Sequence, residues 1–145
     1  MRVRPARPDD LPAMVQGVVD FASERYPDDI ADRAHIADVI AVVIESETSL
    51  ALVMDGPGGC FTGCYLGTIA PNMISAKPDL VEIFFWVEPG FRGHGRSIRG
   101  YVESWAKSRA CVSVALSRPE AAERAGKVFE AWGYVPCERH YRKKL

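Results

Sequence analysis

An apolar and aromatic run, residues 80–87 "LVEIFFWV", is the strongest constraint on how this chain can fold. A strand with so few polar positions has to be covered on both faces, which is typical of a central strand in an α/β domain. Residues 91–97, "FRGHGRS", follow this run and precede apolar residues spaced i, i+3, i+4 and i+7, so we expect a helix that reaches about Arg109. The sequence therefore predicts a buried strand that leads into a helix through a glycine-containing loop.

Helix and strand patterns alternate through the rest of the chain. Before the central run they predict a strand at 2–6, helices at 11–22 and 28–46, and a hairpin of strands at 49–55 and 60–70. After the central helix they predict a strand at 111–117, a helix at 121–132 that stops at Gly133, and a final strand with a basic end at 134–145. This order, β-α-α-β-β-β-α-β-α-β, predicts a single mixed α/β domain over residues 1–145 with about four helices.

Composition and charge exclude several classes of partner. The 18 Lys and Arg nearly balance the 19 Asp and Glu, for a net charge of −1, so no overall field favours nucleic acid or an anionic membrane. The basic end "RHYRKKL" is interpreted as a solvated strand end. No apolar stretch approaches the roughly 20 residues of a membrane span, and the four cysteines form no CxxC motif that would bind a metal. We expect a cytoplasmic protein without a metal site.

The glycine-containing segment allows several interpretations. A P-loop requires GxxxxGK[ST], but no lysine follows these glycines. A dinucleotide fingerprint, GxGxxG, requires a third glycine after Gly93 and Gly95, and Ile98 occupies that position instead. A tight strand-to-helix turn without any ligand is the simplest alternative. A helix N-terminus nevertheless presents free N–H groups and the positive end of its dipole, so an anion-binding role stays open.

Three segments in the right order resemble the GCN5-related N-acetyltransferase (GNAT) superfamily. The stretch "FWVEPGFRGHGRS" resembles its acetyl-CoA motif, R/Q-x-x-G-x-G/A after an apolar strand end and a proline. Ser97 occupies a position where glycine or alanine is usual, which is a mild departure. The opening "VRPARPDDLPAM" and the later "AGKVFEAWGYVPCERHY" resemble other parts of the same superfamily, so the resemblance spans nearly the whole chain. It implies a mostly antiparallel sheet with splayed central strands.

The resemblance also implies how acetyl-CoA would bind as co-substrate. Main-chain groups near Phe85 and Val87 would hydrogen-bond the pantetheine arm, and amides of the segment from Arg92 to Ser97 would hold the pyrophosphate. That segment comprises Arg92, Gly93, His94, Gly95, Arg96 and Ser97. His94 lies at a variable position of the motif, and we interpret it as an exposed loop residue rather than an acid or base.

Acetyl transfer to an amine requires the neutral amine, of which an alkylamine with a pKa of about 10.4 has little at pH 7. Related enzymes often place a glutamate on the central strand as base, and Glu82 is the candidate here, with Glu88 second. Strict alternation would turn Glu82 away from Phe85 and Val87, and a β-bulge would bring it back. The usual general-acid tyrosine falls on Phe129, which can line the cofactor but cannot donate a proton.

The expected function is acetyl-CoA-dependent N-acetylation of a primary amine by direct attack in a ternary complex. A non-catalytic acyl-CoA-binding or interaction protein on the same fold is the alternative, favoured by Phe129 and by Ala122 at a position where asparagine is common. Tyr134, Tyr141 and Ser97 are the other possible proton donors. The acceptor, a small molecule or a peptide, carries no readable signature, and a homodimer is possible.

Overall fold

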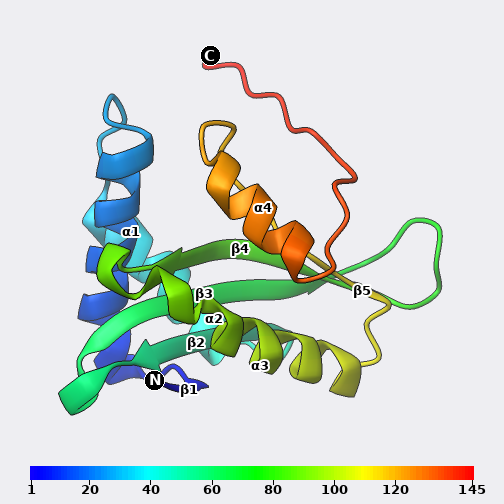
Figure 1. Ribbon diagram of the computed structural model, residues 1–145, viewed down its shortest axis with the longest axis horizontal. Coiled ribbons are helices and arrows are strands. Elements are labelled where there is room, and N and C mark those ends of the chain that lie inside the picture. Colours follow the sequence, from blue (N-terminus) through cyan, green and yellow to red (C-terminus); the bar gives the residue numbers. More distant parts are fainter.

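A computed structural model describes residues 1–145 and contains one five-stranded sheet in the order β1-β2-β3-β4-β5 (Figure 1). The strands are β1 (Arg2–Pro5), β2 (Ser49–Asp55), β3 (Phe61–Ala70), β4 (Asp79–Val87) and β5 (Ser113–Ala115). Neighbours among the first four strands are antiparallel, and β5 runs parallel to β4. The expected mixed, mostly antiparallel α/β sheet is confirmed.

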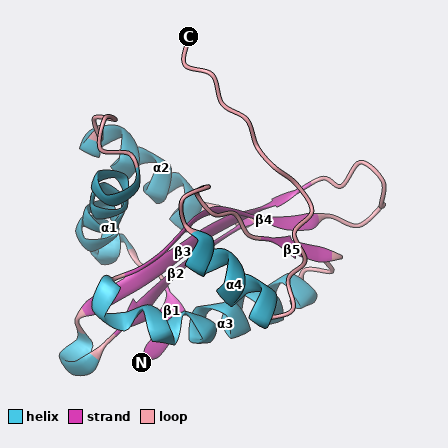
Figure 2. Ribbon diagram, turned by 45° about the horizontal axis from the view of Figure 1, so that its top comes forward, coloured by secondary structure: helices cyan, strands magenta, loops and turns pink.

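Four helices cover the two faces of this sheet, as Figure 2 shows. They are α1 (Leu11–Arg25), α2 (Arg33–Glu45), α3 (Gly95–Ser108) and α4 (Glu123–Ala131). Helices α1 and α2 pack on one face, where Met14, Ile40 and Val53 belong to one buried cluster. Helix α3 packs on the other face, where Leu52, Tyr65 and Ile98 belong to a second cluster. No helix is both long and apolar enough to cross a bilayer.

The second helix begins later than the sequence indicates. It was expected from about residue 28, but α2 starts at Arg33 because Asp32 is its N-cap. The Oδ1 atom of Asp32 accepts a hydrogen bond of 3.1 Å from the backbone N–H of His35. This bond satisfies one of the N–H groups that a helix leaves unpaired at its start. Residues 28–32 form the turn between the two helices instead.

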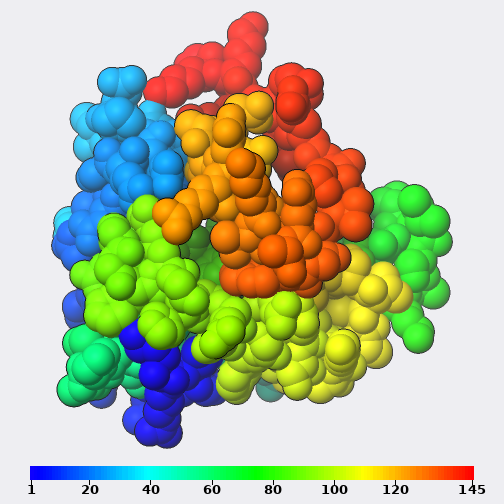
Figure 3. All heavy atoms as spheres, in the orientation of Figure 1, coloured from blue at the N-terminus to red at the C-terminus, as the bar shows by residue number.

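The predicted final strand is absent, which corrects the expected element order. Residues 133–145 form no helix or strand and run back across the molecule towards the α1–α2 turn (Figures 1 and 3). Pro136 lacks the N–H group that a sheet ladder needs. Asp29 holds the far end of this segment, since its carboxylate lies 2.6 Å from Lys144 Nζ and 3.4 Å from Arg142 Nη2.

Helix α4 ends as the sequence predicts, at a glycine. Gly133 has a φ of 91°, a left-handed conformation that glycine adopts without strain. Its N–H donates to the carbonyl of Glu130, and the N–H of Tyr134 donates to the carbonyl of Phe129. These two bonds form a Schellman motif, which closes α4 and turns the chain towards its end.

We predict opposite stability effects for the same substitution at two glycines. A Cβ added at Gly67 would lie 2.5 Å from the hydroxyl of buried Tyr65, whereas one added at Gly100, on the exposed side of α3, would meet nothing within 4 Å. Gly67→Ala should destabilise the fold by roughly 1–3 kcal/mol through overpacking. Gly100→Ala should stabilise it by about 0.5–1 kcal/mol because alanine favours a helix. Urea denaturation measures both, and equal shifts in the two variants would contradict this packing.

Candidate active site

The sheet opens between β4 and β5 after only a short pairing. The ladder joins Asp79 to Ser113 and ends with Val81 opposite Ala115. No backbone hydrogen bond joins β4 beyond Val81 to the chain beyond Ala115. The backbone edge of residues 82–87 therefore faces a gap rather than a neighbouring strand. This opening is the splay that the resemblance to the GNAT superfamily leads us to expect.

Glu82 is the first residue of β4 beyond the paired part. Its Oε2 accepts a hydrogen bond of 3.0 Å from the backbone N–H of Ser117, and its Oε1 lies 3.4 Å from the Ser117 hydroxyl. The side chain of Glu82 thus meets the departing strand where the backbone ladder stops. Burial raises the pKa of this carboxyl to about 7, and the two hydrogen bonds from Ser117 act in the opposite direction. Near neutral pH, Glu82 can therefore accept or release a proton.

A β-bulge brings Glu82 to the same face as Phe85. Glu82 pairs with Gly67 and Phe84 pairs with Leu66, so Ile83 is the extra residue on β4. Ile83 and Phe84 both face α1 and α2, where they line one groove. Strict alternation along β4, which would separate Glu82 from Phe85, is therefore wrong here. Phe85 packs against the cluster under α3, on the side of Glu82.

The segment "FRGHGRS" is not an open loop. Residues 89–94 form a short 3-10 helix, and residues 95–97 form the first turn of α3. In the 3-10 part the N–H groups bond to carbonyls three residues back, so not every amide from Arg92 to Ser97 is free to bind a ligand. The amides of Arg96 and Ser97, in the first turn of α3, have no partner four residues back within the helix.

Side chains in this segment differ in what they contact. Arg92 forms an ion pair of 2.6 Å with Glu24 on α1, and its Nε lies 3.4 Å from the carbonyl oxygen of Val87. It therefore ties the segment to α1 and to the end of β4. His94, Arg96 and Ser97 are exposed beside the start of α3. The exposure of His94 agrees with its interpretation as a surface residue.

The two glycines of the segment have different surroundings. Gly95 is buried, and a Cβ there would contact Trp132 at 3.4 Å and Phe85 at 3.5 Å. Gly93 is exposed, and a Cβ there would meet nothing within 4 Å, so packing gives no reason for a glycine at this position. The open space over Gly93 lies next to the first turn of α3 and the exposed Arg96. A pyrophosphate fits these surroundings because anions favour the N-terminus of a helix.

Phe129 is part of an aromatic cluster at the open edge of β4. Its ring stacks on Phe85, with 6.4 Å between centroids and 10° between planes, and lies 5.8 Å from Trp132. The ring of Tyr134 is 6.4 Å from Phe129, and its hydroxyl lies 3.2 Å from Glu103 Oε1. Burial, reinforced by the Glu103 carboxylate, raises the pKa of Tyr134. The cluster consists of apolar rings, and its one hydroxyl is already bonded.

Two polar groups near the site have no signal in the sequence. Ser117 contacts Glu82 across 35 residues, so only the fold brings them together. Tyr65 is fully buried, its hydroxyl has no hydrogen-bond partner, and its ring packs edge-on against Phe85. Burial, with a contribution from Glu82, raises the pKa of Tyr65. A neutral tyrosine hydroxyl thus lies in the core beneath the carboxyl group.

We predict that Glu82 makes the stability of the fold fall with rising pH. Below about pH 4.5 the carboxyl is protonated in both the folded and the unfolded chain; between about 4.5 and 7 only the unfolded chain releases the proton. Wild type should lose stability across that window relative to Glu82→Gln, which cannot ionise. Thermal denaturation from pH 4 to 8 measures the difference. Glu88→Gln, at the exposed residue after β4, is the control for loss of a carboxylate. If the difference in stability between wild type and Glu82→Gln does not change with pH, Glu82 is not buried as described.

Solved structures with the same fold include acetyltransferases. No family model matches the sequence, and no curated protein matches it either. A transcriptional regulator from Bacillus halodurans C-125 has a TM-score of 0.85 and 16% identity, over 99% of each chain. A ribosomal-protein-alanine N-acetyltransferase from Brucella melitensis biovar Abortus 2308 has a TM-score of 0.77 and 14% identity, over 100% of each chain.

A third solved structure contains a coenzyme A derivative. AAC(6')-Iy in complex with the bisubstrate analogue CoA-S-monomethyl-acetylneamine has a TM-score of 0.77 and 20% identity, over 99% of this chain and 98% of that one. At these identities the likeness shows the fold. The chain therefore has the GNAT fold, as the resemblance of its motifs predicts.

Proposed function

We propose that this protein is an acetyl-CoA-dependent N-acetyltransferase in which Glu82 is the general base. The position of Glu82 carries the proposal: its carboxyl lies at the fork between β4 and β5, half-buried, with a pKa raised to about 7. A strongly perturbed carboxyl beside an opening in the sheet is typical of a catalytic group. The acetyltransferases among proteins of the same fold support this activity.

Acetyl-CoA would lie along the open edge of β4. The unpaired backbone edge near Phe85 suits the amides of the pantetheine arm, which would extend the sheet where β5 departs. At Val87 the carbonyl already lies 3.4 Å from Arg92 Nε, so the pantetheine arm would have to replace that contact. The first turn of α3 and the open space over Gly93 suit the pyrophosphate, with Arg96 supplying positive charge. Phe85 and Phe129 would line the cofactor near its thioester. When bound, acetyl-CoA supplies an activated acetyl group.

Glu82 addresses the hardest part of the reaction. Only about one part in a few thousand of an alkylamine is neutral at pH 7, so a group that removes its proton lowers the barrier. With a pKa of about 7, the Glu82 carboxylate is populated at neutral pH and still basic enough to take that proton, directly or through a water. The amine nitrogen then bonds to the acetyl carbon, and the carbon–sulfur bond breaks.

The leaving thiolate needs less assistance. A thiol with a pKa of about 8.5 is a fair leaving group, so the reaction does not require a strong acid at the position of Phe129. Tyr134 is bonded to Glu103, and Tyr141 is exposed in the C-terminal segment, so neither is placed as a donor. Ser97, at the start of α3, is exposed. Solvent at the open gap can protonate the thiolate.

We predict that Glu82 controls the rate and its pH dependence. Glu82→Gln should lower kcat by about 10²-fold or more, and wild type should lose activity below an apparent pKa of about 7. Ser117→Ala removes a hydrogen bond that favours the carboxylate, so this acidic limb should move to higher pH. Steady-state kinetics from pH 5.5 to 9 measure both. An unchanged rate in Glu82→Gln, with acetyl-CoA binding intact, would exclude Glu82 as base.

We predict that the space over Gly93 is needed for coenzyme A. Gly93→Val places a branched side chain where the free protein has no contact, so the thermal midpoint should hold while coenzyme A affinity falls at least tenfold. Gly100→Val is the matched control, because Gly100 is equally open but lies on α3 away from the first turn. Calorimetric titration with coenzyme A measures both. Equal affinities in the two variants would refute the pyrophosphate position.

A non-catalytic acyl-CoA-binding protein is the second candidate function. Phe129 and buried Ala122 favour it, because neither side chain can donate or accept a proton. Such a protein would bind acetyl-CoA tightly but release no coenzyme A thiol over a broad panel of amines. Thiol release measured with a chromogenic reagent, in the presence and absence of amines, separates the two candidates.

A further inference from the structure

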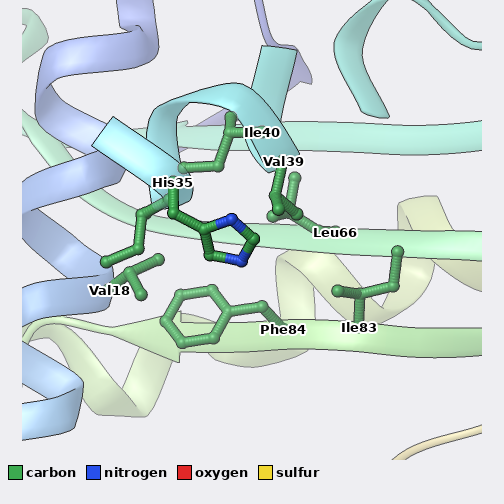
Figure 4. Close-up of a pocket in the computed structure, with 8 residues that line it drawn as sticks. Val18, His35, Val39, Ile40, Leu66, Ile83 and Phe84 are labelled. Atoms are coloured by element: carbon green, nitrogen blue, oxygen red, sulfur yellow. The ribbon is translucent and has the colours of Figure 1, made fainter. Parts of the chain in front are cut away.

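A groove on the face of the sheet away from Glu82 lies outside the proposed cofactor site. It has a volume of about 200 Å³ and lies between α1, α2, β3 and β4 (Figure 4). Its lining consists of Val18, His35, Ile36, Val39, Ile40, Leu66, Ile83 and Phe84. Seven of these eight residues are hydrophobic and none carries a carboxylate. The groove is therefore suited to an apolar group.

The bulge in β4 connects this groove to the proposed catalytic position. Ile83 and Phe84 follow Glu82 directly and both turn to the groove side, so the backbone that carries the base also forms the groove wall. The sheet has no strand beyond the edge of residues 82–87, since β5 pairs only as far as Val81. No further strand therefore separates Ile83, at the groove, from this edge. An acceptor in the groove would extend past Ile83 to an acetyl group held there.

We propose that the groove binds the apolar substituent of the acceptor, so that the substrates are primary amines carrying one small aromatic or branched alkyl group. This inference rests on the proposed acetyltransferase function. A volume of about 200 Å³ is below the roughly 300–1,000 Å³ of pockets for drug-sized ligands, which favours a single ring or short branched chain. His35, at the groove in Figure 4, is the one polar side chain of the lining.

The lack of a negatively charged side chain in the groove argues against polycationic acceptors such as aminoglycosides. Burying an ammonium group among apolar side chains without a partner is very unfavourable. With no carboxylate in the lining, the apolar end of the acceptor enters the groove and the amine stays at the gap beside Glu82. The groove would thus select the acceptor, and Glu82 would take the proton from its amine.

Two valines on α2 provide a matched test. Val39 lines the groove and is 37% exposed, whereas Val42 is 68% exposed and does not line it. Both lie within α2, so Val39→Gln and Val42→Gln change the helix propensity and the polarity of the side chain in the same way. The measured quantity is the ratio of kcat/KM for 2-phenylethylamine to that for ethanolamine. A ratio cancels any general change in catalysis.

The proposal expects 2-phenylethylamine to be preferred over ethanolamine and over an aminoglycoside. Val39→Gln should lower the selectivity ratio at least fivefold, mainly through the KM for 2-phenylethylamine, and Val42→Gln should leave it unchanged. If ethanolamine or the aminoglycoside is the better substrate and Val39→Gln has no effect, the groove assignment is overturned while the acetyltransferase function stands. If both variants act alike and also dissociate a dimer in sedimentation, a second copy covers α2 and the proposal is overturned.

A binding measurement without turnover separates the groove from the chemistry. Isoleucine methyl resonances of the protein without acetyl-CoA should shift on titration with 2-phenylethylamine, at Ile83 and Ile36, and Val39→Gln should abolish the shifts. Shifts without any coenzyme A release in kinetic assays would support the groove and refute the acetyltransferase function. Neither shifts nor turnover would overturn both.

Discussion

The short pairing of β4 with β5 is the feature on which the rest of the site depends. After Val81 and Ala115 the two strands separate, so the polar groups at the fork need other partners. The Glu82 carboxylate accepts the N–H of Ser117, which replaces a ladder bond by a side-chain contact. The result is a carboxyl that is partly desolvated, held in place and adjacent to an unpaired strand edge. Such an edge can receive an extended ligand, and the carboxyl can exchange a proton there.

The bulge at Ile83 determines which side chains of β4 lie on each face of the sheet. Glu82 and Phe85 lie on the side of α3, whereas Ile83 and Phe84 lie on the side of α2. Without the extra residue, alternation would place either the carboxyl or the aromatic ring on the wrong side. One backbone irregularity therefore supports both the proposed cofactor edge and the proposed acceptor groove. Bulges occur often beside active sites for this reason.

The aromatic residues at the open edge bear on which half of the proposed reaction the site could assist. Phe85, Phe129 and Trp132 contact one another and offer no proton donor. The proposed site is therefore suited to remove a proton from the amine rather than to protonate the leaving thiolate. This asymmetry agrees with the chemistry, because the neutral amine is scarce at pH 7 and a thiolate leaves readily.

Local pattern determined much of the architecture. The apolar run 80–87, the helical stripe after it and the glycine stop at Gly133 all predict elements that the structure contains, because each depends on neighbours a few residues away. The start of α2 was placed too early because a cap at Asp32 competes with propensity. The final strand was wrong because pairing with a distant edge cannot be derived from a segment alone, and Pro136 weakens it. Motif resemblance pointed to Glu82 and to the segment from Arg92 to Ser97.

By itself, the sequence thus determined the order of most elements, the central strand and the identity of the residues available for chemistry. Only the tertiary structure decided on which face Glu82 lies, which partner holds it and which groups surround the gap. The physical reason is the range of the interactions: the bulge follows from the register with β3, and the contact with Ser117 joins segments 35 residues apart. The raised pKa of Glu82 arises from burial by the whole fold, and no short stretch of sequence carries that information.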